Sequence, residues 1–390
     1  MLIFLIRQFP DLDHMTPVIY KICQGGKYSV KLLCQNLDYD INNDFLIQYL
    51  RDEFGIETEY TYDHFHDSAL KRFFSRFFLW IRRKFPGLGL RLFVRVHPFL
   101  YDGKWAERLV ANLEVSALIL DFHKGYKFST KVLTKEARKQ KIPIIALTHG
   151  ITMRLTDIEK QTSLPMIDYK IFPNKHKVAF FKTEEDSDKM IKILGSPRYC
   201  DEWERIYNNI LKAKFSDSAL PHARGKLKVL FFERPRIGFY GDHDTVQAVR
   251  ELDFVNVVYK GKPRIKTPNQ IIANSQYPSA RLIQWADVVV MSISSIAIEV
   301  LWQKKTLIYM KYLAPDHICV FDQYGACWTV NSQDELINAL KTIYKNPDYR
   351  PYDQKNIEKL FRDVVYAGDR SKDILKDYSD FILSVNDKPK

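Results

Sequence analysis

Short apolar runs alternate with helical segments along almost the whole chain of 390 residues. Met1–Arg7, Ala117–Asp121 and Ile142–Leu147 are such runs, which are typical of parallel strands buried on both faces. Because a crossover helix returns the chain to the same sheet in parallel orientation, the alternation predicts an α/β fold. A hydrophobic content of 46% with 27% charged residues is that of a globular protein, and the length allows two domains with separate cores.

The polar stretch 213–226, which contains Pro221 and Gly225, is the predicted linker. It divides the chain into an N-terminal Rossmann-like domain, 1–212, and a C-terminal one, 227–390. Three helices are expected to close the second domain: Gln333–Tyr344, Gln354–Val365 and Ser371–Val385. Two such domains facing a central cleft would bind ligands at the carboxyl ends of their strands.

The N-terminal segment has no signal-peptide pattern, and no apolar run is long enough to span a bilayer, so we expect a cytoplasmic protein. After the strand Met1–Arg7 we expect a loop with Asp11, Asp13 and His14, then a helix from about Pro17. Leu92–Val96 is predicted to be a strand.

The five cysteines lack C-x-x-C spacing, which favours free thiols over a zinc site.

The net charge of +12 indicates an anionic partner, and much of it lies between residues 69 and 100, where there is no Asp or Glu. Within 68–85, apolar residues recur at helical spacing and predict an amphipathic helix with basic flanks. They are Leu70, Phe73, Phe74, Phe77, Phe78, Ile81 and Phe85. Such a helix can lie at an anionic membrane surface, which would make the protein peripheral at the inner membrane, or it can pack on the domain core.

The segment Trp285–Tyr309 has the pattern of strand, loop, helix and strand. We expect its helix to begin at Ser292, Ser294 and Ser295, whose hydroxyls and first-turn N–H groups would bind a phosphate. Glu299 lies one turn further on, where it could contact a ribose. The alternative is that the serines only cap a helix and Glu299 is solvated.

Further candidates follow other predicted strands. His149, Asp157 and Glu159 come after Ile142–Leu147. His149 could act as a general base or hold a phosphate, or it could bond a neighbouring backbone group. Asp157 and Glu159 could act as acid or base, or they could be solvated. Glu233, with Arg234 and Arg236, follows Lys228–Phe232, and Asp242 and Asp244 come next; a carboxylate kept ionised there could be a nucleophile or part of a salt bridge. Lys260, Lys262 and Arg264 follow Val255–Tyr259, where three converging cations favour a phosphate.

Four short motifs in this order resemble the GT-B glycosyltransferases of bacterial surface polysaccharide assembly. They are His149-Gly150, Gly195-Ser-Pro-Arg198, Lys260-x-Lys-Pro-Arg264 and Ser292-x-Ser-Ser-x-x-x-Glu299. Within that fold the chain looks most like the retaining β-Kdo transferases, and less like CDP-glycerol glycerophosphotransferases and UDP-N-acetylglucosamine 2-epimerases. The resemblance implies a CMP-sugar donor in the C-terminal domain, an acceptor glycan in the N-terminal domain, and no metal or other cofactor.

The resemblance further implies a double displacement with an Asp nucleophile. This chain departs from that pattern, because Glu233 stands in the nucleophile region, with Asp242 and Asp244 as alternatives, and because Lys262 stands where related enzymes often carry His.

We therefore expect a metal-independent enzyme that transfers Kdo or a related ulosonic acid from its CMP derivative to a lipopolysaccharide O-antigen or capsule. Six cations of the protein would bind the carboxylate and the phosphate of the donor: Arg198, Arg234, Arg236, Lys260, Lys262 and Arg264. Alternatives are polyol-phosphate transfer from CDP-glycerol, with His149 as base, and a non-enzymatic basic protein that binds membranes or nucleic acid. No nucleic-acid-binding signature is present, so we expect no nucleic-acid partner.

Overall fold

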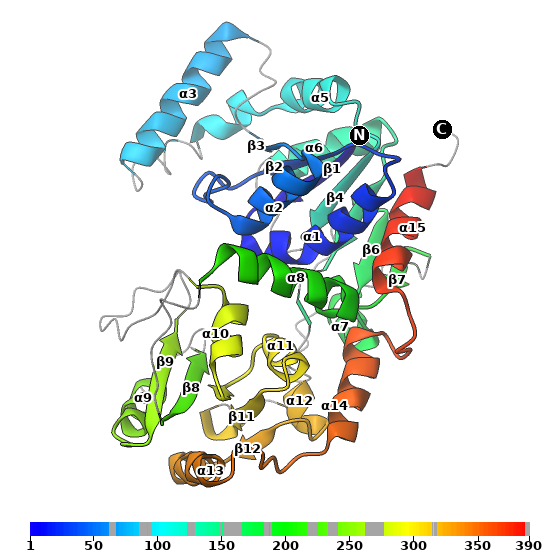
Figure 1. Cartoon of the computed structure of the whole chain (residues 1–390). Coiled ribbons are helices and arrows are strands. Elements are labelled where there is room, and N and C mark those ends of the chain that lie inside the picture. The colour runs from blue at the N-terminus through cyan, green and yellow to red at the C-terminus, as the bar shows by residue number, and fades with distance from the viewer. Residues whose placement is uncertain are drawn as a thin grey trace. The chain divides into compact units, whose positions relative to one another are not determined.

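The computed structural model describes residues 1–61, 68–85, 92, 95–122, 129–148, 150–151, 166–182, 187, 189–216, 225–232, 241–261, 277–313, 315 and 318–386. The chain forms two compact units (Figure 1). Unit 1 comprises Met1–Gly150, Lys160–Trp203 and Ser371–Lys390, and unit 2 comprises Ile151–Glu159 and Glu204–Arg370.

Unit 1 contains a parallel sheet of seven strands within the described residues, in the order β3-β2-β1-β4-β5-β6-β7. The strands are β1 (Leu2–Ile6), β2 (Val30–Cys34), β3 (Thr58–Tyr60), β4 (Ala117–Asp121), β5 (Ile144–Leu147), β6 (Tyr169–Phe172) and β7 (Ile191–Ile193). Every residue of the central strands β1, β4 and β5 is buried, as the continuous apolar runs predict. Ile3 and Leu5 pack on one face against Trp105 and Leu133, which belong to helices of that face.

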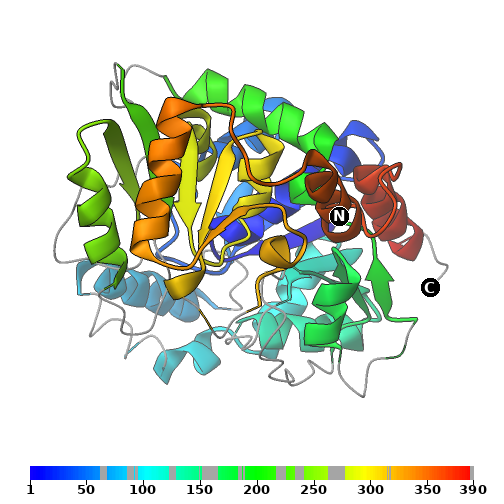
Figure 2. The same ribbon diagram turned by 90° about the horizontal axis from the view of Figure 1, so that it is seen from below.

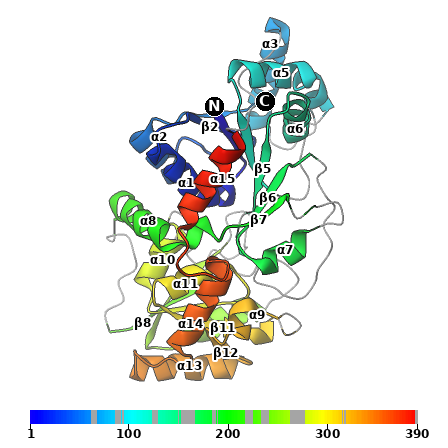
Figure 3. The same ribbon diagram turned by 90° about the vertical axis from the view of Figure 1, so that its right-hand side faces the viewer.

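The helices of unit 1 are α1 (Phe9–Gln24), α2 (Phe45–Phe54), α3 (Ala69–Lys84), α5 (Gly103–Asn112), α6 (Ser129–Lys139), α7 (Lys175–Phe181) and α15 (Ile374–Asn386), with a short 3₁₀ helix, η1 (Pro197–Tyr199). Figure 3 shows α15, in red, beside α1. Asp44 caps α2 by accepting hydrogen bonds from the N–H groups of Leu46 and Ile47, and Gly55 ends it in the left-handed conformation that glycine adopts without strain.

Unit 2 contains a parallel sheet of five strands within the described residues, in the order β12-β11-β10-β8-β9. The strands are β8 (Leu227–Phe232), β9 (Val255–Lys260), β10 (Val288–Met291), β11 (Thr306–Met310) and β12 (Trp328–Val330). The helical segments are α9 (Gly241–Arg250), α10 (Ser279–Trp285), α11 (Ala297–Trp302), η3 (Lys311–Leu313), α12 (Val320–Gln323), α13 (Gln333–Lys345), α14 (Gln354–Leu360) and the π-helical turn η4 (Phe361–Val365). Figure 2 shows α13, in orange, along this sheet. The predicted α/β class with two Rossmann-like sheets is confirmed.

The division into units differs from the sequence-based boundary. The helix α8 (Asp201–Lys214) runs through the change from unit 1 to unit 2 without a break, so the change precedes the predicted linker at 213–226. The last helix, α15, belongs to unit 1 rather than to the second half. Its buried Leu375 and Tyr378 explain this, because α15 packs on α1, and the Tyr378 hydroxyl donates to the Gly195 carbonyl at 2.9 Å.

Two local expectations were wrong. Asp11, Asp13 and His14 lie inside α1, which begins at Phe9 and continues through Pro17. Residues 95–100, expected to belong partly to a strand, are helical, because Val96 and Leu100 lie one turn apart and both pack on the core of unit 1.

The five cysteines lie in the described part of the chain and form no disulfide. Across that same part, none of the helices combines the length and the apolar character needed to span a lipid bilayer.

Candidate functional site

Each sheet has a point where the strand order reverses. In unit 2 the first strand, β8, has β9 on one side and β10 on the other, so the reversal lies between β8 and β10. Open parallel sheets bind ligands beyond the carboxyl ends of the strands at such a point. The turn 292–296, which follows β10 and leads into α11, therefore lies where a ligand of this unit is expected.

The three serines belong to this turn and not to the helix. The expectation that the helix begins at the serines is corrected: α11 begins at Ala297 and Ile296 is its N-cap. The Ser294 hydroxyl accepts from the Ile296 N–H at 3.4 Å, and the Ser294 carbonyl accepts from the Ala297 N–H at 3.3 Å. Ser292 is buried, whereas Ser294 and Ser295 are partly exposed, so their side chains border both the turn and the solvent.

Glu299 is buried, with 1% of its surface exposed, so the alternative of a solvated helix residue is excluded. Its Oε1 accepts from Gln303 Nε2 at 3.4 Å, and that amide also donates to the Ala280 carbonyl at 3.3 Å. A buried carboxylate is costly unless it is hydrogen-bonded, and this contact holds the Glu299 carboxylate in the first turn of α11, directly after the serine turn.

Lys260 is the last residue of β9, at the same edge of the sheet. Its ammonium donates to the Tyr277 carbonyl at 2.8 Å, and burial lowers its pKa to about 8. A cation whose pKa is lowered by desolvation gains from a nearby anion, so Lys260 is suited to contact a phosphate.

Most of the other predicted residues lie outside the described residues. They are His149, Asp157, Glu159, Glu233, Arg234, Arg236, Lys262 and Arg264. Asp242 is the second residue of α9, the helix that follows β8, so its backbone lies in the first turn of a helix on one side of the reversal point. Asp244 follows in the same helix.

Arg198 lies in unit 1, whereas Lys260 and the serines lie in unit 2. It belongs to η1 and is almost fully buried, and its Nε donates to Asp13 Oδ1 at 2.7 Å. Burial raises the pKa of the Asp13 carboxyl, and the charge of Arg198 opposes that shift. Arg198 therefore has a structural ion-pair partner of its own.

Unit 1 carries a cluster that the sequence reasoning missed. Its strand order reverses between β1 and β4, and Arg7, which follows β1, joins the two sides. Arg7 Nη2 donates to Asp121 Oδ2 at 2.5 Å, and Arg7 Nε donates to Asp11 Oδ2 at 3.0 Å. Both carboxylate side chains are at most 2% exposed, while Arg7 is 24% exposed. The sequence signal that could have revealed this cluster is Asp121, a charged residue at the end of the apolar strand Ala117–Asp121.

Lys177, in α7, is a further, partly buried cation near this cluster. Burial lowers its pKa to about 8, and the Asp121 carboxylate opposes that shift. The carboxyl edge of the unit 1 sheet thus holds two partly buried cations beside two buried carboxylates. Such groups can hold an anionic or hydroxyl-bearing ligand, or can move a proton.

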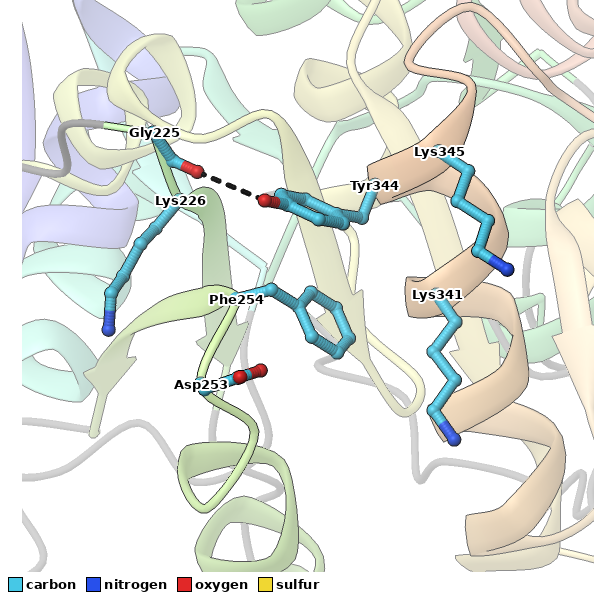
Figure 4. Close-up of a pocket in the computed structure, with 7 residues that line it drawn as sticks. All are labelled: Gly225, Lys226, Asp253, Phe254, Lys341, Tyr344 and Lys345. Carbon is cyan, nitrogen blue, oxygen red and sulfur yellow. Dashed lines mark hydrogen bonds between the residues drawn. The ribbon is translucent and has the colours of Figure 1, made fainter.

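A pocket of about 500 Å³ lies at the other edge of the unit 2 sheet (Figure 4). It is lined by Gly225, Lys226, Asp253, Phe254, Lys341, Tyr344 and Lys345. These residues precede β8 and β9 or belong to α13, so the pocket is at the amino ends of the strands and is separate from the serine turn. Among the described residues, no group of three or more His, Cys, Asp or Glu side chains is arranged to hold a metal ion.

No protein-family model matches the sequence, and no curated protein matches it significantly. Solved structures do match its fold. UDP-GlcNAc 2-epimerase from Neisseria meningitidis, bound to UDP-GlcNAc, is 11% identical over 98% of this chain and 99% of its own, with a TM-score of 0.54. The corresponding epimerase from Rickettsia bellii is 12% identical over 99% of this chain and 96% of its own, with a TM-score of 0.57.

The wall teichoic acid polymerase TagF is 13% identical over 99% of this chain and 88% of that chain, with a TM-score of 0.57. A variant of TagF soaked with CDPG also matches, with a TM-score of 0.55. This chain therefore has a GT-B-type fold, and at these identities the likeness is one of fold alone.

Proposed function

We propose that this protein is an enzyme that transfers a group from a nucleotide-linked donor, and that unit 2 binds the nucleotide. The proposal rests on one observation. The serine turn and the buried Glu299 follow a strand that borders the point where the strand order of a parallel sheet reverses. The similar folds were solved with UDP-GlcNAc, with UDP and with CDPG, which supports a nucleotide ligand for this chain.

The donor that we propose is a CMP-linked acidic sugar, Kdo or a related ulosonic acid, with a bacterial surface glycan as acceptor. The support is the set of basic residues at or just after the ends of strands β8 and β9, of which the structure describes Lys260 at the carboxyl edge. A donor carrying both a carboxylate and a phosphate uses more cations than a phosphate alone. We propose that neither a metal nor another cofactor is needed.

For the chemistry we propose a retaining double displacement. Glu233 or Asp242 would attack the anomeric carbon as CMP leaves with the bonding electron pair on its phosphate oxygen. The acceptor hydroxyl, losing its proton to His149, Asp157 or Glu159, would then displace the carboxylate and restore the original configuration.

A second candidate is transfer of a polyol phosphate from a CDP-linked donor, which the likeness to TagF favours. Incubation with CMP-, CDP- and UDP-linked donors, followed by chromatography of the released nucleotide, separates the two. We expect release of CMP from a CMP-linked acidic sugar. Release only from the CDP-linked donor would favour the second candidate, and the absence of both release and nucleotide binding would contradict an enzyme of this kind.

Replacing both Ser294 and Ser295 by leucine should abolish detectable CMP binding. Bulky apolar side chains would fill the space next to the turn and remove its hydroxyls, while the buried strands β10 and β11 stay unchanged. Calorimetric titration measures the affinity, and thermal unfolding of the protein without ligand checks the fold. Unaltered CMP affinity in a folded variant would mean that the serines only shape the turn.

Nucleotide affinity should also depend on pH through Lys260. Because burial holds its pKa at about 8, and a bound phosphate would raise that pKa, binding should be at full strength below pH 8 and weaken as the ammonium is lost above it. We expect about a tenfold loss per pH unit between 8 and 9.5, the limit for one linked proton. Titrations with CMP between pH 7 and pH 9.5 measure this change in affinity.

Two variants control the pH experiment. Lys260→Gln should bind weakly with a flat profile. Lys305→Gln should keep the wild-type profile, because Lys305 is also desolvated, with its pKa lowered by burial, but lies before β11 at the opposite edge of the sheet. A wild-type profile that stays flat from pH 7 to 9.5 would remove Lys260 from the phosphate site.

A further inference from the structure

The helix α3 has one face packed against the rest of unit 1. Phe74 and Phe78 contact the core cluster, and Ser75 is buried with its hydroxyl 2.6 Å from the Tyr101 hydroxyl. Lys71 Nζ lies 2.7 Å from Asp102 Oδ2 on the same side. These contacts recur at helical spacing and fix the orientation of the helix. α3 is thus anchored to unit 1 by a single stripe of side chains.

The opposite stripe of α3 is apolar and exposed. Leu70, Phe73, Phe77 and Trp80 follow one another at intervals of three or four residues and are 61%, 64%, 43% and 54% exposed. The rings of Phe73 and Phe77 are stacked, with centroids 6.4 Å apart, and Phe77 stacks on Trp80 at 6.3 Å. The sequence pattern places Phe73, Phe74, Phe77 and Phe78 on one face. The structure divides them between an inner stripe, with Phe74 and Phe78, and an outer stripe, with Phe73 and Phe77. Exposed apolar patches of this kind mark interaction surfaces.

The exposed stripe is bordered by positive charge. Arg72 and Arg76 lie one turn apart and are exposed, and Lys84 Nζ lies 5.1 Å from the centre of the Trp80 ring. From residue 69 to residue 100 the sequence contains no carboxylate side chain. The partner of this surface must therefore offer an apolar environment for the aromatic rings and negative charge for the cations. An apolar groove without acidic groups would meet only the first requirement.

We propose that α3 docks on an anionic lipid surface, with the outer stripe inserted at headgroup level and the basic residues contacting lipid phosphates. A helix with one exposed apolar stripe and neighbouring cations matches the geometry of an interfacial helix. A second copy of the chain is a poorer partner, because pairing two α3 helices would bring two sets of like charges together. Figure 1 shows α3 at the margin of unit 1, away from its sheet. This proposal does not depend on the reaction proposed above.

Co-sedimentation of the full chain with vesicles tests the charge requirement. We expect binding to phosphatidylcholine vesicles containing 30% phosphatidylglycerol at low salt, and little binding to phosphatidylcholine alone. Each basic residue near an anionic surface contributes about fivefold, so Arg72→Glu with Arg76→Glu should weaken binding at least about 30-fold. The matched control is Lys341→Glu with Lys345→Glu, which makes the same change in net charge at the same spacing on the exposed side of α13.

Tryptophan fluorescence tests the aromatic stripe. Among the described tryptophans, Trp80 is the most exposed, so anionic vesicles should shift the emission to the blue in the wild type but not in Trp80→Phe, which should still sediment with them. Phe73→Ser with Phe77→Ser should lose binding at an unchanged thermal midpoint.

Three results would overturn the proposal: no sedimentation of the wild type, equal weakening by the α13 control, or a dimer that forms through α3 and disappears in Phe73→Ser with Phe77→Ser.

Discussion

An Arg7→Met variant should lose about 3 kcal/mol of unfolding free energy, the low end of the cost of removing one partner of a buried ion pair. Arg7 is the cation that joins Asp11 and Asp121 at the strand-order reversal of unit 1, and both carboxylates are almost fully buried. Methionine keeps much of the side-chain volume, so the loss would reflect charge and hydrogen bonds more than packing. Urea unfolding, followed by circular dichroism, measures it.

Two further variants distinguish this explanation from a general effect of removing arginine. Arg7→Met combined with Asp121→Asn should recover part of the lost stability, since one of the two carboxylates that lose contact with Arg7 is then neutral. Arg51→Met removes an exposed arginine that lies 3.4 Å from an Asp52 oxygen and should change stability by less than about 1 kcal/mol. Equal losses in Arg7→Met and Arg51→Met would show that the buried carboxylates do not depend on Arg7.

Asp242→Asn should lower turnover about 100-fold or more while CMP affinity changes little. The reason is that a group that acts in the transition state affects the rate more than donor binding. Asp242 lies in the first turn of α9, after β8, on one side of the reversal point in unit 2. Glu233→Gln is the competing test. Steady-state rates of CMP release, with affinities from calorimetry, measure both, and a sugar adduct detected by intact mass would identify the nucleophile.

Asp253→Asn is the matched control for these variants. Asp253 is also an aspartate of unit 2, but it lines the pocket at the amino ends of the strands (Figure 4), so its loss should leave turnover unchanged. If Asp242→Asn, Glu233→Gln, His149→Ala, Asp157→Asn and Glu159→Gln all keep wild-type turnover, the proposed catalytic centre is wrong even though the fold stands.

Most strands of both units could be predicted because their signal is local, whereas β3 and β12, of three residues each, were not predicted. The strand Ala117–Asp121 was predicted with the bounds that the structure has. The start of α1 could not be placed from local rules, since Pro17 removes a backbone donor inside a helix. Burial of Leu12, Met15 and Ile19 on one face outweighs that loss, and the Thr16 hydroxyl donates to the Leu12 carbonyl at 2.7 Å within the affected turn.

The candidate site was predictable to a smaller degree. The serine turn and Lys260 follow strands in the sequence, so their position at a carboxyl edge could be inferred. The contact between Arg7 and Asp121 joins residues 114 positions apart, and no periodic pattern links them. In the same way, the pattern of α3 indicates an amphipathic helix, but only the contacts of Phe74 and Phe78 show which of its two aromatic stripes is inside.

Most of unit 2, Glu204–Arg370, is inserted within unit 1, because the chain leaves unit 1 in α8 and returns to it for α15. A mechanical load applied between the two ends of the chain would therefore act first on unit 1, at the contact between α15 and α1. The hydrogen bond from Tyr378 to Gly195 is one of the contacts of α15 that such a load would have to break. Until α15 detaches, unit 2 lies outside the path of the force. In a single-molecule pulling experiment, release of α15 should precede any unfolding of the nucleotide-binding sheet, and Tyr378→Phe should lower the force of that first event.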